Sequence, residues 1–225
     1  MPSSCDLTPA LPEPANPHSS PPVMQSSLPC SLSLVALALL AGCNTDSRSA
    51  KTTFLDVHEF GPGKVNAAAV AEAHRADLAV EAKHGVRFID YWVDERAGIV
   101  YCLSEAPAAH NVVDTHREAH GLLPARVLTV TGGEPAIPAG NRKLFIDVHE
   151  FTPGSVKAKD VAEAHRKDLA AQERFGVNFL NYWVDESTGT VICLSEAPDA
   201  EAVRETHRNA HGLLPVRIEE VTGAR

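Results

Sequence analysis

The sequence FLDVHEF at residues 54–60 returns as FIDVHEF at residues 145–151, 91 positions further along the chain. This offset aligns residues 54–132 with residues 145–223 without a gap, and 50 of the 79 aligned positions are identical. A period this long that occurs only twice indicates a domain duplication rather than a solenoid. The segment 133–144 contains the Pro and Gly residues expected of a linker between two domains.

Each copy is expected to run strand, helix, strand, strand, helix, strand. The expected strands of the first copy are Phe54–Phe60, Val86–Val93, Ile99–Glu105 and Arg126–Val130, and the expected helices are Ala67–Lys83 and Ala108–His120. Glycines at the ends of these segments mark the turns, with Gly85 expected just after the first helix. The order is that of the split β-α-β, ferredoxin-like unit, whose helices lie on one face of an antiparallel sheet.

The face of such a sheet that carries no helices is expected to pack against another part of the protein. Strict alternation along the strands places Phe54, Phe60, Phe88 and Trp92 on that face. A copy of 79 residues is small for a stable core, so these apolar side chains are expected to be covered by the second copy. The sequence therefore predicts an α+β protein of two tandem ferredoxin-like (βαββαβ) units packed as a pseudo-dimer.

Composition narrows the function classes. The 225 residues are 44% apolar and 22% charged, which is ordinary for a globular protein and excludes a collagen, a coiled coil or a polytopic membrane protein. The formal net charge of −9 argues against a nucleic-acid partner, because phosphates attract basic surfaces. Five cysteines are too few for a disulfide scaffold.

The N-terminal segment is expected to be a bacterial lipoprotein signal. Residues 1–42 read as a signal peptide or disordered leader, whose apolar run from Leu32 is too short to span a bilayer. The run ends in Leu-Ala-Gly-Cys43, which resembles a lipobox, so residues 43–53 are expected to be a lipidated Cys43 and its tether. This predicts a lipid-anchored protein of the cell envelope that meets the membrane through that lipid only. The leader lacks the usual basic start, and the alternative is a disordered tail with a chance apolar patch.

Eight of the eleven histidines occur as four pairs at equivalent positions in the two copies. In each copy two lie four residues apart, on one face of the second expected helix, and a third lies three residues before an aspartate on the first. The two helices are expected to run parallel, so these side chains can converge between them. The predicted metal ligands are His74, Asp77, His116 and His120 in the first copy and His165, Asp168, His207 and His211 in the second. Imidazoles with a carboxylate suit Zn, Ni, Cu or Co, whereas the alternative is a set of core histidines held by hydrogen bonds.

A second histidine cluster is expected on the first strand. Asp56 and His58 share one face of it, as do Asp147 and His149 in the second copy, and they are expected near the interface between the copies. They could act as ligands or in acid–base chemistry, or could simply form a buried, hydrogen-bonded pair.

Two cysteines recur at equivalent positions. Cys102 and Cys193 are expected to be buried thiols that pack as small apolar residues. Metal ligation and a disulfide between these two thiols remain open as alternatives.

The recurrent motifs DVHEF, AEAHRxDLA, YWVDE, CLSEAP and HRxAHG resemble the DUF4242 family, over about 158 of the 225 residues. That family comprises short ferredoxin-like proteins and includes a nickel-binding bacterial protein. The resemblance implies a ferredoxin-like fold that pairs as a dimer, and nickel binding. The positions that match its recurrent His and acidic residues are His58, His74, Asp77, His116 and His120, with their partners in the second copy. This chain departs from the family's single-domain form in its duplication and its leader.

The leading hypothesis is a binding protein for a divalent transition metal, nickel by resemblance, tethered to the cell envelope, and binding is favoured over catalysis. The alternative is a small-molecule enzyme of the paired ferredoxin-like α+β barrel type, with Asp56, His58 and Trp92 in acid–base chemistry inside the barrel. A third possibility is a purely structural module. The copies are expected to pair within one chain, and further homo-oligomers are left open.

Overall fold

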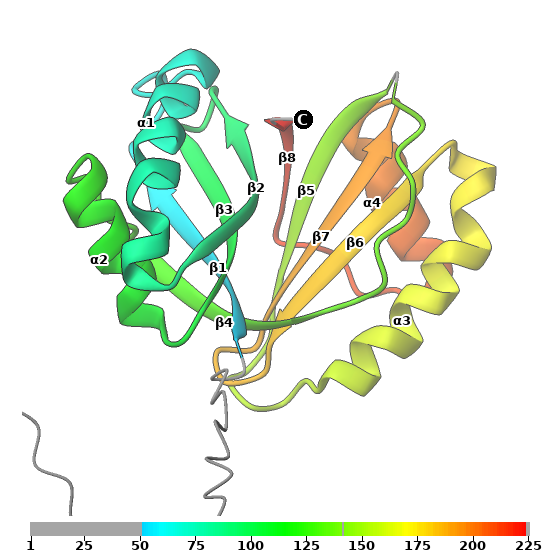
Figure 1. The fold of residues 1–225 in the computed structure, drawn as a ribbon. Helices are drawn as coiled ribbons and strands as arrows, with labels where there is room; N and C mark the ends of the chain where they lie inside the picture. The colour runs from blue at the N-terminus through cyan, green and yellow to red at the C-terminus, as the bar shows by residue number, and fades with distance from the viewer. Residues whose placement is uncertain (1–50, 141, 224–225) are drawn as a thin grey trace, which may run out of the picture. The chain divides into compact units, whose positions relative to one another are not determined.

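The computed structural model describes residues 51–140 and 142–223 (Figure 1). The expected signal peptide, Cys43 and most of the tether lie outside these residues. The first half contains β1 (Thr52–Glu59), α1 (Ala67–Val80), β2 (Arg87–Asp94), β3 (Ile99–Ala106), α2 (Ala109–Ala119) and β4 (Arg126–Gly132). The second half contains β5 (Lys143–Glu150), α3 (Ala158–Ala171), β6 (Asn178–Asp185), β7 (Thr190–Ala197), α4 (Ala200–Ala210) and β8 (Arg217–Gly223).

The eight strands close into one barrel, in the order β1-β3-β2-β8-β5-β7-β6-β4. Each half supplies four antiparallel strands, and two short ladders join the halves, with Trp92 opposite Gly223 and Gly132 opposite Trp183. The helices of each half lie on the outside of the sheet formed by that half (Figure 1). The mixed α+β fold and the pairing of two similar halves are therefore confirmed.

Local sequence explains where the first helix begins and ends. The side chain of Asn66 accepts a hydrogen bond from the amide of Ala69 at 2.9 Å and so caps the N-terminus of α1. A short 3-10 helix at Glu81–His84 follows α1, and Gly85 then adopts a left-handed conformation with φ of 70°. The single helix expected over Ala67–Lys83 is thus an α-helix with a tighter last turn.

The expected distribution of strand residues between the two faces is wrong for three of four aromatic side chains. The barrel interior holds Leu55, Val57 and Trp92, whereas Phe54 and Phe88 pack under the helices, with Phe60 against them. One cause is a β-bulge in β2, where the register with β3 shifts between Phe88 and Asp90 and reverses the alternation. The other is that alternation along β1 does not say which of its two faces meets the helices.

The linker between the halves lies along the edge of β6. The amide of Gly133 donates to the carbonyl of Tyr182 at 3.0 Å, and that of Ala136 donates to Leu180 at 2.7 Å. The buried carboxylate of Glu196 accepts from the amides of Ala139 and Gly140. Residues 133–140 therefore pack against the second half. In the part of the chain that is described, no helix is long and apolar enough to cross a membrane.

Candidate metal centre

His116, on α2, lies between two aspartates in the first half. Its Nδ1 is 2.9 Å from Oδ1 of Asp77 on α1, and its Nε2 is 3.4 Å from Oδ1 of Asp56 on β1. The same Asp56 oxygen is 3.0 Å from Nε2 of His58, two residues along β1. All four residues are buried, with exposed fractions of 4% or less. Helix α2 thus places one imidazole where carboxylates from a strand and from the other helix meet.

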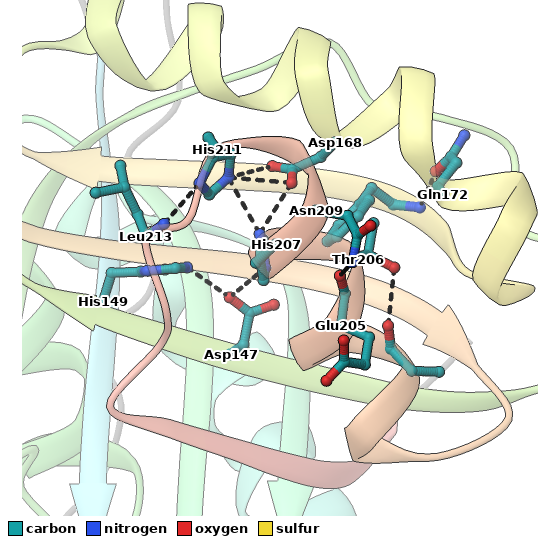
Figure 2. Close-up of polar contacts among 12 residues, drawn as sticks. Asp147, His149, Asp168, Gln172, Glu205, Thr206, His207, Asn209, His211 and Leu213 are labelled. Carbon is teal, nitrogen blue, oxygen red and sulfur yellow. Dashed lines mark hydrogen bonds and ion pairs between the residues drawn. The ribbon is translucent and has the colours of Figure 1, made fainter.

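The second half repeats the arrangement (Figure 2). His207 lies 3.0 Å from Asp168 through Nδ1 and 3.2 Å from Asp147 through Nε2. Nε2 of His149 is 3.0 Å from Asp147. This agreement between halves that differ at 29 of 79 aligned positions follows from the identity of these residues in the two copies.

His120, the C-cap residue of α2, lies on the side of the cluster nearest to solvent. Its Nε2 lies 3.2 Å from Oδ1 of Asp77 and 3.3 Å from Nδ1 of His116. Its Nδ1 accepts a hydrogen bond from the amide of Leu122 at 3.1 Å. Because an amide can only donate, the proton of the neutral ring is on Nε2 and points toward Asp77. His211 makes the same contact with the amide of Leu213 (Figure 2).

The paired carboxylates keep the central imidazole charged. Burial alone would lower the pKa of His116, but the hydrogen bonds and charges of Asp56 and Asp77 outweigh it and raise the pKa to about 9. For His207 the corresponding pKa is about 10. Burial would likewise raise the pKa of Asp56, yet the hydrogen bonds from His116 and His58 hold it below its usual value. Without a bound cation, each cluster therefore contains an imidazolium between two carboxylates.

The expected quartet forms only in part. Asp77, His116 and His120 offer ligand atoms within 4.8 Å of one another, as do Asp168, His207 and His211. His74 is not in this group, since its ring packs 4.7 Å from Tyr91. His165 packs in the same way, 4.7 Å from Tyr182. Burial lowers the pKa of both His74 and His165, which keeps them neutral at physiological pH.

The second cluster is wrongly placed by the sequence argument. Asp56 and His58 face the helices rather than the interface between the halves, and they join the first cluster through His116. The reason is that Leu55 and Val57 occupy the barrel-facing side of β1. Asp147 and His149 are placed in the same way on β5.

The recurrent cysteines belong to the same buried groups. Cys102 offers its sulfur within 4.8 Å of ligand atoms of Asp56, His58 and His116, and Cys193 does so in the second half. Both thiols are free, so the disulfide alternative is wrong. Burial, together with the charge of the nearby aspartates, raises the pKa of both thiols well above its usual value.

A pocket opens onto each cluster. Its volume is about 220 Å³ in the first half and about 180 Å³ in the second. The cluster residues His58, Asp77, His116 and His120 form part of the first pocket's lining, together with His74. The remaining lining is mostly apolar, and it includes Val65, Val70, Tyr91, Val100 and Leu122. Tyr91 and Leu122 were not singled out from the sequence, and the only signal for them there is that YWVDE and HGLLP recur in both copies.

Together these features define a duplicated α+β barrel protein with two equivalent, pocket-facing acid–histidine centres. Residues 54–130 and 145–221 each match the model of the family described as nickel responsive protein SCO4226-like. The two matches cover more than half of the chain, so the chain belongs to this family.

Solved structures include one relative of clear sequence similarity. The crystal structure of SCO4226 from Streptomyces coelicolor A3(2) is 39% identical over 34% of this chain and 93% of that chain, with a TM-score of 0.33. A putative monooxygenase from Fusobacterium nucleatum is 10% identical over 78% of this chain and 94% of that chain, with a TM-score of 0.44. A heme-binding protein from Thermus thermophilus is 11% identical over 77% of this chain and 90% of that chain, with a TM-score of 0.40. No curated protein matches.

Proposed function

We propose that the chain binds a divalent transition metal, nickel, with one ion at the floor of each pocket. The observation that carries this proposal is the convergence of Asp77, His116 and His120 on one point beside the pocket, repeated by their partners in the second half. Imidazole and carboxylate ligands suit nickel among the divalent metals. The family, described as nickel responsive, supports the same metal. The order of elements in each half supports its assignment as a ferredoxin-like unit.

The donor atoms fit one ion per half. His116 belongs to two possible ligand groups, one with Asp77 and His120 and one with Asp56, His58 and Cys102. A neutral imidazole offers one nitrogen to a metal while the other nitrogen donates to a carboxylate that orients it. All three residues of the outer group line the pocket, whereas the inner group includes Asp56, which does not, so the outer group is the more open to an entering ion. In this assignment Asp56 orients His116 from behind.

The same assignment identifies what must change on binding. An ion at Nε2 of His120 displaces the proton that points toward Asp77, and the neutral ring then carries its proton on Nδ1. Nδ1 can no longer accept from the amide of Leu122, which is now 3.1 Å away. We therefore expect the turn after α2, around Gly121 and Leu122, to rearrange when metal binds.

Metal content is the direct test of the proposal. The tag-free chain, equilibrated with Ni²⁺ and desalted, is expected to retain two ions per chain by elemental analysis. The variant Asp77→Ala is expected to retain one, because the second half is intact and serves as an internal control. His74→Ala is expected to retain two ions, because His74 lies outside the ligand group. Loss of a residue that orients a ligand typically weakens binding 10–100-fold, so the affinity change for His74→Ala is expected to stay below about tenfold. Retention of no nickel by the wild-type chain would overturn the proposal.

Small-molecule binding is the second candidate function. It is favoured by the apolar lining and the size of the pockets, which at about 220 and 180 Å³ exceed the needs of a single ion. A reaction of Asp56 and His58 inside the barrel is disfavoured, because both side chains face the helices and the interior is lined by apolar residues such as Leu55. Any chemistry of Asp56 and His58 would take place on the helix side.

The cell-envelope tether is a proposal that rests on the sequence alone. The apolar run that ends in Leu-Ala-Gly-Cys43 supports lipid attachment at Cys43. Intact mass spectrometry of the chain isolated from the membrane fraction of a bacterial host is expected to show an acylated Cys43 as the first residue. Cys43→Ser is expected to move the protein out of that fraction. Detection of an unmodified chain that retains residues before Cys43 would contradict the proposal.

A further inference from the structure

A group of polar side chains joins the two halves inside the barrel. Tyr101 on β3 is fully buried, and its hydroxyl donates to Oε2 of Glu219 on β8 at 2.5 Å. Oε1 of Glu219 lies 3.1 Å from Nε of Arg217, so the carboxylate also has a cationic partner. The surrounding interior is apolar, with Leu55, Trp92 and their neighbours in a single cluster. Nη2 of Arg217 also donates to the Tyr101 hydroxyl at 3.5 Å, and Glu219 is the acceptor for the proton of that hydroxyl.

The repeat does not reproduce this contact on the other side of the barrel. The residue 91 positions after Tyr101 is Ile192, and the residue 91 positions before Glu219 is Leu128. Both belong to the apolar interior cluster. Arg217, in contrast, has Arg126 as its counterpart. Each half therefore contributes one member of a polar pair and one member of an apolar pair.

This distribution penalises the pairing of a half with a copy of itself. Two first halves would each place Tyr101 against Leu128 and bury two hydroxyls without an acceptor. Two second halves would each place Glu219 against Ile192 and bury two carboxylates without the phenol. An unsatisfied buried polar group disfavours a state by roughly ten- to a hundredfold, and a charged group by more. Only the pairing of unlike halves gives the Tyr101 hydroxyl an acceptor and gives the Glu219 carboxylate a donor besides Arg217.

We propose that Tyr101 and Glu219 form a selectivity contact through which the first half docks onto a second half and rejects another copy of itself. The partner that this interior surface fits is the complementary half, which the same chain supplies. The two copies thus differ in the side chains that they place in the interior of the barrel, while the residues of their acid–histidine centres are identical.

An exchange of two residues tests the proposal in the full chain. Tyr101→Ile combined with Ile192→Tyr keeps the composition but moves the phenol to the half that carries Glu219 and Arg217. Each half then fits a copy of itself. By light scattering after gel filtration, this variant is expected to have at least twice the mass of the wild-type chain. Adding Leu128→Glu and Glu219→Leu restores complementarity between unlike halves, beside Arg126, and is expected to restore the wild-type mass.

A matched control separates selectivity from general repacking. Leu55 and Ile146 are equivalent positions in the same interior, both fully buried. Their exchange, Leu55→Ile with Ile146→Leu, is expected to leave the mass unchanged. If the Tyr101 exchange fails to fold, recovery of folding in the fourfold variant supports the proposal, and failure of the fourfold variant overturns it. A Tyr101 exchange variant with wild-type mass and thermal midpoint also overturns it. Metal content is a separate readout, so this test stands independently of the proposed nickel binding.

Discussion

A chain that carries both His116→Ala and His207→Ala is expected to retain no Ni²⁺ under conditions in which the wild-type chain retains two ions. His116 is the one imidazole common to both groups of ligand atoms in the first half, and His207 has that place in the second. Loss of an outer-shell partner already costs 10–100-fold, so loss of the shared ligand is expected to weaken each site by at least about a hundredfold. Each single variant is expected to retain one ion.

One control and one gentler double variant make the result interpretable. His84→Ala with His110→Ala removes two histidines that lie outside the clusters and have no counterpart in the repeat, and it is expected to retain two ions. Removal of His116 leaves the buried carboxylates of Asp56 and Asp77 without their shared cationic partner. Loss of one partner of a buried ion pair typically lowers the free energy of unfolding by about 3–5 kcal/mol. His120→Ala with His211→Ala is therefore a gentler test, because these side chains are less buried. The assignment would be refuted if the His116/His207 variant and the His120/His211 variant were both folded by circular dichroism and both retained two ions.

The apparent affinity for Ni²⁺ is expected to rise about tenfold per pH unit between about pH 6.5 and 9. Aspartates hold the pKa of His116 at about 9 and that of His207 at about 10, so each ring is protonated at neutral pH. A metal ion at either ring must displace that proton, and each unit of pH lowers the cost of doing so. Titration against a competing chelator at pH 6.5, 7.5 and 8.5 measures the slope. An affinity independent of pH in this range would exclude His116 and His207 as ligands.

The stability of the metal-free chain is expected to change in the opposite direction. The pKa of His116 is raised from about 6.5 in the unfolded chain, so its stabilising contribution is complete below about pH 6.5 and is lost as the pH rises toward about 9. The shift corresponds to about 3 kcal/mol. Asp56 has a lowered pKa, and its contribution is lost as the pH falls below its usual value near 4. Urea midpoints without metal should therefore fall from pH 6 to 9, while the stabilisation by added Ni²⁺ grows.

Much of the candidate site follows from spacing on the helices. His116 and His120 lie one turn apart, and Asp77 meets them because α1 and α2 pack side by side on one sheet. Helical periodicity is local, so it places His116 with His120, whereas Asp77 joins them through the expected packing of the two helices. His74 shows the limit of that argument. It is one turn from Asp77, but its ring turns to Tyr91, because the direction of a side chain depends on what packs around it.

For the residues on the strands, the face of the sheet on which each side chain lies could be assigned only from the tertiary structure. Alternation puts Asp56 and His58 on one side of β1, but the choice between barrel and helices is made by what the sheet packs against. The bulge in β2 shifts the register after Phe88, and no residue near it signals the change in the sequence. Burial of Asp56 beside His116 is what converts two separate predicted clusters into one centre.

The sequence by itself determined the duplication, the order of strands and helices, and the residues of each acid–histidine centre on the helices, because repeats and helical spacing are properties of neighbouring positions. Only the tertiary structure decided that Asp56 and His58 join that centre and that Tyr101 meets Glu219 across the barrel. The first contact arises because α2 packs on the sheet of its own half. The second joins residues 118 positions apart and arises from the closure of the two sheets into one barrel. A local pattern contains no information about that closure.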